Sequence, residues 1–345
     1  MNSSCRNDAA RIESAEHHRA DWQRELAHAI TGVDELLETL GLDKSPAAEL
    51  VSRTLSNDGF PLRVPRGYVA RMRHGDPDDP LLRQVLPLAT EADVLPGFVA
   101  DPVGDLASSR ARGLLQKYHG RALLMTTGAC AVHCRFCFRR NFPYREETAT
   151  PRHLDAAFAS IAADSSITEI ILSGGDPLSL TDSRLAELFE RAGRIGHLRR
   201  IRIHSRQPIV LPERVDEGLI STLRNSPLPV VFVSHCNHPD EIDASVHAAL
   251  SRVRKATSML FNQAVLLRGV NDSAVVLATL CERLFDAGVT PYYLHQLDAV
   301  AGAAHFSIPD AEARNLVAEL AAVVPGYLLP RLVRELPGEA AKRAL

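Results

Sequence analysis

The regular spacing of short apolar runs is the feature that most constrains the fold of this chain. After residue 168 such runs begin about every 30 residues, and the segments between them have the spacing of amphipathic helices. Two parallel strands need a long crossover connection, which is usually a helix. The rhythm therefore predicts an α/β protein built on a parallel sheet.

Six runs are the predicted strands, at residues 121–125, 169–175, 200–206, 229–235, 259–267 and 291–297. The helical patterns between the later runs lie at residues 183–193, 215–225, 244–256 and 274–288. Six units of this kind predict a partial (β/α)6 barrel that resembles a TIM barrel. A doubly wound open sheet would show the same spacing and stays an alternative.

Polar residues gather where the predicted strands end. They are Cys130, Ser173 to Asp176, His204 to Arg206, His235 to His238, Asn262 to Gln263, and Gln296 to Asp298. In barrels of this kind the carboxyl ends of the strands carry the active site. We therefore expect these side chains to surround one site.

Outside the predicted barrel, the chain divides into segments of different character. Residues 1–20 are polar and predict a flexible N-terminus. Residues 21–105 predict a helical cap, because a helical apolar pattern is followed by short helices broken by prolines. The barrel is expected over residues 106–300, and a short C-terminal segment over residues 301–345.

Composition limits the classes of binding partner and the cellular location that we expect. The formal net charge of −3, with both signs mixed, gives no reason to expect nucleic-acid or membrane binding. No apolar stretch approaches the length of a membrane span, and the N-terminus lacks the apolar core of a secretory signal. The six cysteines do not resemble a disulfide framework. We expect a cytoplasmic globular protein.

Three cysteines, Cys130, Cys134 and Cys137, stand close together in the run TTGACAVHCRFCFRRNFPY. Thiolates are soft ligands that suit iron–sulfur clusters or zinc. A 4Fe-4S cluster held by three thiolates leaves one iron open to a small molecule, whereas a structural zinc site takes four ligands. Zinc with a fourth ligand from His133 or Cys236 is the alternative.

The spacing CxxxCxxC resembles the signature of the radical S-adenosylmethionine enzymes, which implies that the open iron binds S-adenosylmethionine. A second motif, LSGGDPL, places Ser173, Gly174, Gly175 and Asp176 after the second predicted strand. Paired glycines allow a close backbone approach. In radical S-adenosylmethionine enzymes a glycine-rich turn at this place holds the methionine amino group. The resemblance also places His235 on the adenosyl side of the pocket.

Further segments follow these motifs in a fixed order. The set is CRFCFRR, LSGGDPL, RIHSRQPIVLPERV, HCNHPDEID, FNQAVLLRGVND, PYYLHQLDAVAGAAHF and GYLLPRLVRELPGEAAK. Together they resemble the lysine 2,3-aminomutase family across most of residues 60–342. The resemblance is greater to the shorter branch, which makes β-lysine for the modification of elongation factor P.

The family resemblance implies a second cofactor, pyridoxal phosphate. The lysine that carries it matches Lys342 in PGEAAK, and such an amine must lose its proton to react. Without the resemblance, Lys342 would be interpreted as a frayed terminal charge. Arg121 resembles the arginine that binds the cofactor phosphate. Gln263 resembles a polar contact to the same cofactor.

The resemblance also implies how an amino acid would be held. Arg139 matches the arginine that clamps the substrate carboxylate, for which a planar fork is suited, and Arg140 is the fallback. Asp298 and Glu335 match the two positions that surround the distal ammonium. A pair of anions at the far end of a pocket favours a cationic side chain.

The activity implied is a lysine 2,3-aminomutase, an isomerase that converts L-α-lysine to β-lysine. The reaction would use hydrogen abstraction by a 5′-deoxyadenosyl radical and 1,2-amino migration, and it needs a reducing electron donor. A functional link to elongation factor P and its lysyl ligase follows. The alternatives are a catabolic lysine or other amino-acid 2,3-aminomutase and a non-catalytic, metal-stabilised interaction module. The roles of His204, His238 and Cys236 stay open.

Overall fold

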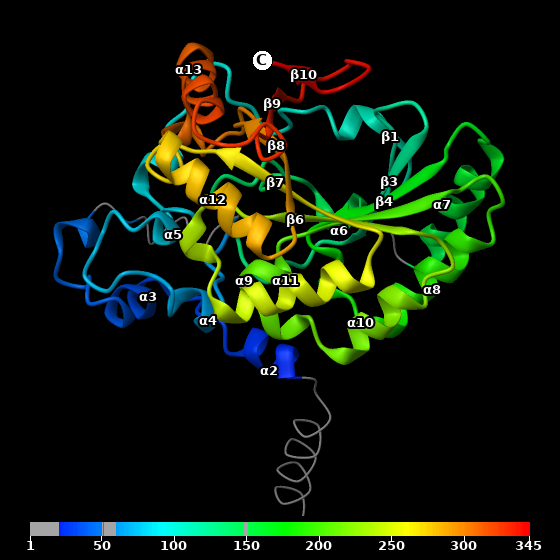
Figure 1. The fold of residues 1–345 in the computed structure, drawn as a ribbon, viewed down its shortest axis with the longest axis horizontal. Coiled ribbons are helices and arrows are strands. Elements are labelled where there is room, and N and C mark those ends of the chain that lie inside the picture. The colour runs from blue at the N-terminus through cyan, green and yellow to red at the C-terminus, as the bar shows by residue number, and fades with distance from the viewer. Residues whose placement is uncertain (1–20, 50, 52–59, 148–150) are drawn as a thin grey trace, which may run out of the picture.

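One curved sheet organises the molecule (Figure 1). The computed structural model describes residues 21–49, 51, 60–147 and 151–345. Within these ranges the sheet has ten strands, each beside its neighbours in sequence, and no pairing joins β10 back to β1. Strands β3 to β9 are parallel, whereas β1, β2 and β10 pair antiparallel at the two ends. The partial barrel predicted from the spacing is thus confirmed.

All six predicted strands are present, and the structure adds a seventh parallel strand, β9. The strands are β1 (Ser109–Ala111), β2 (Leu114–Leu115), β3 (Arg121–Thr127), β4 (Glu169–Gly174), β5 (Arg200–Ser205), β6 (Val230–His235), β7 (Met259–Leu266), β8 (Thr290–Gln296), β9 (Arg331–Arg334) and β10 (Arg343–Ala344). Strand β9 is too short and too basic to stand out as an apolar run.

The crossover helices lie on the outer side of this sheet (Figure 1). They are α7 (Pro151–Ala163), α8 (Asp182–Gly193), α10 (Glu217–Arg224), α11 (Ala244–Ala256), α12 (Ala274–Asp286) and α13 (Asp310–Ala321). Three of them begin at a side-chain cap, since Thr181, Asp216 and Asp243 each accept a hydrogen bond from a backbone N–H in the first turn.

Alternation along the strands separates the core from the interior of the barrel. On β7, Leu260, Ala264 and Leu266 are buried and belong to the main hydrophobic cluster that the helices complete. The intervening Gln263 and Val265 are only half buried. Because successive side chains in a strand point to opposite faces, these half-buried residues face the inside of the partial barrel.

The N-terminal cap consists of short helices joined by turns. The helical apolar pattern is split into α2 (Asp21–Ala27) and α3 (Val33–Thr39), and Ile30 between them pairs with Val64.

The other short helices of the described residues lie in the cap and in the loops of the sheet. They are η1 (Pro46–Glu49), α4 (Arg66–Val69), α5 (Pro80–Arg83), η2 (Ala89–Ala92), η3 (Leu106–Ser108), α6 (Tyr144–Glu147), η4 (Pro177–Ser179), α9 (Gln207–Val210), η5 (Pro212–Arg214), η6 (Pro239–Glu241) and η7 (Ala304–Phe306).

The C-terminal segment folds back on the sheet. After α13 the chain forms β9 beside β8, turns, and returns as β10 antiparallel to β9. Arg343 pairs with Arg334 and Ala344 with Val333, and the Leu345 N–H donates to the Leu332 carbonyl. This pairing fixes the residues just before β10.

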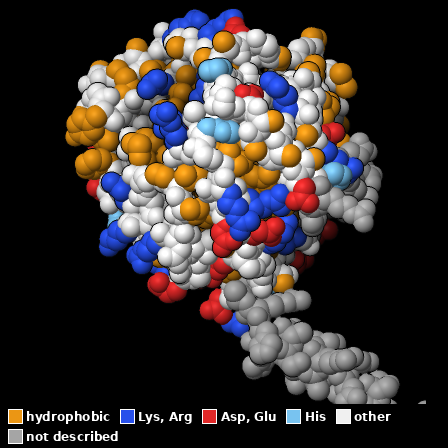
Figure 2. Space-filling model, turned by 90° about the vertical axis from the view of Figure 1, so that its right-hand side faces the viewer, with side chains coloured by type: hydrophobic (Ala, Val, Ile, Leu, Met, Phe, Trp, Pro, Cys, Tyr) orange, Lys and Arg blue, Asp and Glu red, His pale blue; other side chains and the backbone are white. Residues whose placement is uncertain are grey.

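The surface and the N-terminus complete the description. The flexible segment predicted for residues 1–20 lies outside the described residues. On the face seen in Figure 2, acidic and basic side chains are interspersed with hydrophobic ones. Among the described residues, no helix has both the length and the apolar composition needed to cross a membrane.

A buried ion pair joins the cap to the loop that carries the cysteines. Glu91 of η2 accepts hydrogen bonds from Arg135 Nε at 2.9 Å and Arg140 Nη2 at 2.6 Å. The side chains of Glu91 and Arg135 are completely buried. Burial alone would raise the pKa of Glu91, but the two guanidinium groups hold it below its usual value.

Neutralising the Glu91 carboxylate tests the contribution of this ion pair to stability. We expect Glu91→Gln to lower the free energy of unfolding by about 3–5 kcal/mol, because it leaves two buried guanidinium groups without a counter-ion. Chemical denaturation measures the change. Glu190→Gln, in an exposed pair with Arg194, is the control and should change the free energy by no more than about 0.5 kcal/mol. Equal effects of the two substitutions would contradict the role of Glu91.

Candidate active site

The cysteine loop follows β3 directly and lies at the carboxyl edge of the sheet. Cys130, Cys134 and Cys137 are free thiols in this loop. Burial raises the pKa of Cys137 to about 11 and also raises the pKa values of Cys130 and Cys134, because a buried thiolate lacks solvation. In this loop a thiolate is poorly solvated unless a positive charge lies beside it. Three such sulfurs therefore suit a metal cluster, whose positive charge would stabilise the thiolates.

The glycine turn after β4 lies against the start of this loop. Gly175 N–H donates to the Thr127 carbonyl at 2.7 Å, and Asp176 N–H donates to the Ala129 carbonyl at 2.8 Å. Gly174 has a φ of +124°, and a Cβ atom on Gly175 would lie 2.4 Å from the Ala129 oxygen. The paired glycines are therefore required for the approach of two backbone segments.

The Asp176 carboxylate is hydrogen-bonded to other groups of the protein chain. Its carboxylate accepts hydrogen bonds from the backbone of Leu178 at 2.9 Å and of Arg206 at 2.8 Å, and from Ser205 Oγ at 2.8 Å. Burial raises its pKa, although these hydrogen bonds oppose the shift. Asp176 thus ties the glycine turn to the end of β5.

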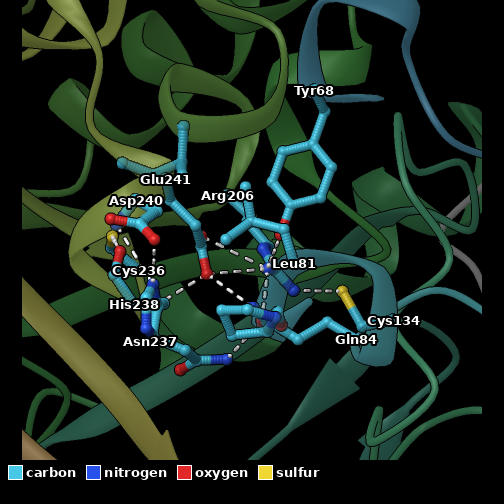
Figure 3. Close-up of polar contacts among 12 residues, drawn as sticks. Tyr68, Leu81, Gln84, Cys134, Arg206, Cys236, Asn237, His238, Asp240 and Glu241 are labelled. Atoms are coloured by element: carbon cyan, nitrogen blue, oxygen red, sulfur yellow. Dashed lines mark hydrogen bonds and ion pairs between the residues drawn. The ribbon is translucent and has the colours of Figure 1, made fainter. Parts of the chain in front are cut away.

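Arg206 connects the cysteine loop with the cap (Figure 3). This buried residue follows β5 and donates from Nη1 to Cys134 Sγ at 2.8 Å. Its Nη2 contacts Gln84 Oε1 at 2.7 Å and Glu241 Oε2 at 3.3 Å. Burial disfavours its charge, but Cys134 and Glu241 raise its pKa overall.

Arg139, the predicted carboxylate clamp, is buried beside Asp105. Its Nε lies 2.6 Å from Asp105 Oδ2, and its Nη1 donates to Ser173 Oγ at 3.2 Å. Lys117 contacts the other Asp105 oxygen at 2.5 Å. Burial opposes the ionisation of Asp105, yet Arg139 and Lys117 together lower its pKa. The fallback Arg140 instead binds Glu91.

Glu335 and Lys342 face each other across the C-terminal hairpin. Lys342 Nζ contacts Glu335 Oε2, and Lys117 Nζ lies 2.9 Å from Glu335 Oε1. Burial opposes the ionisation of Glu335, but the two lysines lower its pKa to about 2. Because β10 pairs with β9, Lys342 is held beside Glu335 and is not a frayed end.

Asp298 belongs to the same group of charges, but its pKa is raised whereas that of Glu335 is lowered. Burial raises its pKa to about 7, and the negative charge of Glu335 adds to the shift. Its Oδ1 atom is buried and has no hydrogen-bond partner among the described residues. A buried acceptor without a donor suits a cationic ligand group.

Several interior histidines also lack partners. The Nε2 atoms of His204, His235 and His295 are buried without a hydrogen bond in the described part of the chain. Burial lowers the pKa of all three, that of His295 to about 3, so they are neutral at pH 7. Nearby Lys342 contributes to the shifts of His204 and His295, which places the Lys342 amine close to these rings.

Arg121 and Gln263 lie deeper in the barrel. The Arg121 guanidinium stacks 4.8 Å from the Tyr118 ring, and its buried Nε has no partner among the described residues. The Tyr118 hydroxyl is also unpartnered there, and its pKa is raised by burial and by Glu335. Gln263 stands level with His235 on the neighbouring strand.

The zinc alternative lacks a suitable fourth ligand. His133 Nδ1 lies 2.8 Å from the Pro61 carbonyl, and its ring stacks on Phe60. Cys236 Sγ points to the His238 carbonyl at 3.5 Å. Across the described ranges, no group of three His, Cys, Asp or Glu side chains, the three cysteines included, lies close enough to hold one metal ion.

Sequence reasoning missed the residues that balance charge in this site. Asp105 and Lys117 each contact a predicted site residue, and His295 lines the interior. None of them belongs to a spacing pattern. The usable signal was weak, since His295 directly precedes the polar group at the end of β8 and Lys117 lies four residues before β3.

Comparison with known proteins identifies the family of this chain. A family model described as a 4Fe-4S single cluster domain matches residues 119–202, which include the three cysteines and the glycine turn. The L-lysine 2,3-aminomutase of Escherichia coli is 47% identical over 95% of both chains. The chain belongs to the L-lysine 2,3-aminomutase family. It is therefore an isomerase and not a non-catalytic interaction module.

Other relatives extend the comparison within this family. The L-lysine 2,3-aminomutase of Haemophilus influenzae is 41% identical, with 93% of this chain and 94% of that one covered. The corresponding protein of Clostridium subterminale is 32% identical over 93% of this chain and 77% of its own length.

Among solved structures, a radical SAM methyltransferase from Sphaerobacter thermophilus aligns with a TM-score of 0.44 at 20% identity, covering 64% of this chain and 68% of that one.

The contact between the glycine turn and the cysteine loop can be tested by adding one methyl group. We expect Gly175→Ala to displace the loop backbone, to destabilise the fold by about 1–3 kcal/mol and to lower iron uptake. Iron and sulfide content after anaerobic reconstitution is the measurement. Gly196→Ala is the control, because nothing lies within 4 Å of its added Cβ. Normal iron content in Gly175→Ala would show that the close approach is dispensable.

Proposed function

We propose that this chain converts L-α-lysine to β-lysine by a radical 2,3-amino migration. One observation carries the proposal. Asp298 and Glu335 place two partly buried carboxylates near Lys342, whereas Arg139 lies next to the cysteine loop and the glycine turn. Two carboxylates and a guanidinium in one interior match a substrate with a carboxylate and a distal ammonium group.

The three cysteines would hold a 4Fe-4S cluster. Their burial and their raised pKa values fit ligands that are deprotonated by a metal. The turn Ser173–Asp176 and His235 are assigned to S-adenosylmethionine. His235 supports this assignment, since its buried Nε2 has no partner among the described residues and its ring lies 5.5 Å from that of Phe136 in the cysteine loop.

A second group of interior residues fits pyridoxal phosphate. Lys342 supplies the amine that would carry it. Arg121 Nε is a buried cationic donor without a partner in the described chain, which suits a phosphate group. Gln263 faces the interior one strand away from His235 and is assigned as a further polar contact.

The cofactors supply the difficult chemistry, namely a radical that abstracts hydrogen and a ring that stabilises the migrating nitrogen. The chain's own residues bind and orient the substrate. Arg139 would hold the carboxylate with its position fixed by Asp105, and Asp298 would accept the distal ammonium at Oδ1. The burial of these groups excludes water, which protects a reactive intermediate.

The second anion has a supporting role in the ligand-free protein. Glu335 is ionised, since its pKa lies near 2, and it binds Lys117 and Lys342 at the same time. Glu335 would thereby position the Lys342 amine that is assigned to the cofactor. Asp298, with a pKa near 7, is the carboxylate that exchanges a proton at neutral pH.

We further propose that the product supplies the modification of elongation factor P through its lysyl ligase. The resemblance of the ordered motifs to the shorter branch of the family supports this proposal over a catabolic aminomutase. Free lysine fits the paired carboxylates as a substrate. A cytoplasmic location and an external reducing electron donor belong to the same proposal.

The decisive experiment is anaerobic reconstitution with iron, sulfide, S-adenosylmethionine and pyridoxal phosphate, followed by incubation with L-lysine under reducing conditions. We expect β-lysine, and we expect a mass increase of elongation factor P when its ligase is added. Rearrangement of another amino acid in place of lysine would overturn the substrate assignment. A colourless, zinc-loaded protein without turnover would overturn the radical mechanism.

Lys342→Ala tests the cofactor amine. We expect borohydride to fix pyridoxal phosphate covalently to the wild-type chain but not to the variant, whereas both chains retain the cluster. Turnover of lysine should be lost. Lys255→Ala, at the exposed end of α11, is the control and should behave as wild type. Covalent attachment to the Lys342→Ala chain would remove this residue from the proposed role.

Asp298 should make lysine use depend on pH. Only its ionised form attracts an ammonium group, and its pKa is raised to about 7. We therefore expect kcat/KM for lysine to rise between about pH 6 and pH 8. Asp298→Asn should lower kcat/KM by about 10–100-fold and flatten that rise, because the amide oxygen still accepts a hydrogen bond but carries no negative charge to attract the ammonium. The same pH dependence in wild type and variant would assign the titration elsewhere.

A further inference from the structure

A single guanidinium group links the cap to one of the cysteine sulfurs. Arg206 Nη1 lies 2.8 Å from Cys134 Sγ, and Arg206 is only 7% exposed. Figure 3 shows Arg206 between Cys134 on one side and Glu241 on the other. A hydrogen bond from a cation to a sulfur places positive charge directly at this ligand.

The charge of Arg206 is balanced by one buried carboxylate. Glu241 is completely buried, and its Oε2 lies 3.3 Å from Arg206 Nη2. Glu241 also accepts a hydrogen bond from Gln84 Nε2 at 2.8 Å. The electrostatic effect of Arg206 on Cys134 is thus opposed by Glu241 through a short, dry path, where charges interact strongly.

Cap residues fix the orientation of this pair. Gln84 Oε1 accepts from Arg206 at 2.7 Å and from Asn237 Nδ2 at 3.0 Å, and the Tyr68 hydroxyl lies 3.3 Å from Arg206 Nη2. The guanidinium cannot rotate away from Cys134 without breaking these contacts. Its Nε is buried and has no partner among the described residues, which leaves one donor for a group absent from the protein chain.

We propose that Arg206 and Glu241 set the reduction potential of the cluster held by Cys130, Cys134 and Cys137. The proposal rests on the cluster assigned above. Adding an electron makes the cluster more negative, so a donor and a cation at Cys134 stabilise the reduced form and raise the potential. Glu241 acts in the opposite direction. Arg206 is a positioning and tuning residue, since it acts through a cluster ligand.

The test is the midpoint potential of the reconstituted cluster, measured anaerobically by spectroscopic titration at constant pH. We expect Arg206→Gln to shift the potential to more negative values and Glu241→Gln to shift it to more positive values. Arg206→Lys keeps the charge and should lie closer to wild type than Arg206→Gln does. A merely structural role would not move the potential in opposite directions for the two neutral variants.

Arg214→Gln is the matched control. Arg214 is another fully buried arginine, but it binds the Leu178 carbonyl and Asp182 at the far side of the glycine turn. Its substitution should lower stability and leave the midpoint potential unchanged. A shift in Arg214→Gln as large as that in Arg206→Gln would overturn the proposal.

Two outcomes separate the failure of this proposal from the failure of the proposed function. Wild-type protein that takes up no iron and sulfide removes both. Wild-type protein that holds a cluster and makes β-lysine, combined with an unchanged potential in Arg206→Gln, overturns only the tuning role. If Arg206→Gln does not fold or does not load iron, an unchanged potential in Glu241→Gln overturns the proposal in its place.

Discussion

The parallel hydrogen-bond ladder from β3 to β9 is the constraint on which the rest of the structure depends. In a parallel ladder the carboxyl ends of all strands meet at one edge. Pairing of Met125 with Ser173, Ser205 with Ser234 and His235 with Gln263 keeps those ends level. The cysteine loop, the glycine turn and the interior histidines converge because each follows or ends one of these strands.

Charge balance is the second requirement, because this edge is covered by the cap and desolvated. The buried arginines near the cysteine loop each form an ion pair. Glu91 pairs with Arg135 and Arg140, Asp105 with Arg139, and Glu241 with Arg206. An unpaired buried charge would cost several kcal/mol. The anions come mainly from the cap and from turns after the strands. The cap therefore takes part in the electrostatics of the site as well as in covering it.

The unpartnered atoms show where ligands are accommodated. Arg121 Nε, Asp298 Oδ1 and the Nε2 atoms of the three interior histidines are buried without hydrogen bonds among the described residues. Native interiors rarely leave such groups unsatisfied. Those that lie inside the partial barrel indicate an interior shaped for polar ligands.

Much of the fold and part of the site were predictable from local patterns. The six strands, the crossover helices and the position of the cysteines after the first barrel strand are confirmed, since period and motif spacing are local properties. Strand β9 was not predicted, because four residues with two arginines carry no apolar signal. The partners Asp105 and Lys117 were also missed, because they lie far apart in sequence from Arg139 and Glu335, which they contact.

The sequence by itself determined the strand–helix rhythm, the soft-ligand triplet and the family to which the motifs belong. Only the tertiary structure decided which charges face one another. It showed that Lys342 is held against Glu335 by the β9–β10 pairing, that the glycine pair serves the contact with the cysteine loop, and that Arg206 reaches Cys134. Such contacts depend on how separate segments pack in a medium of low dielectric constant, and no local pattern of residues encodes them.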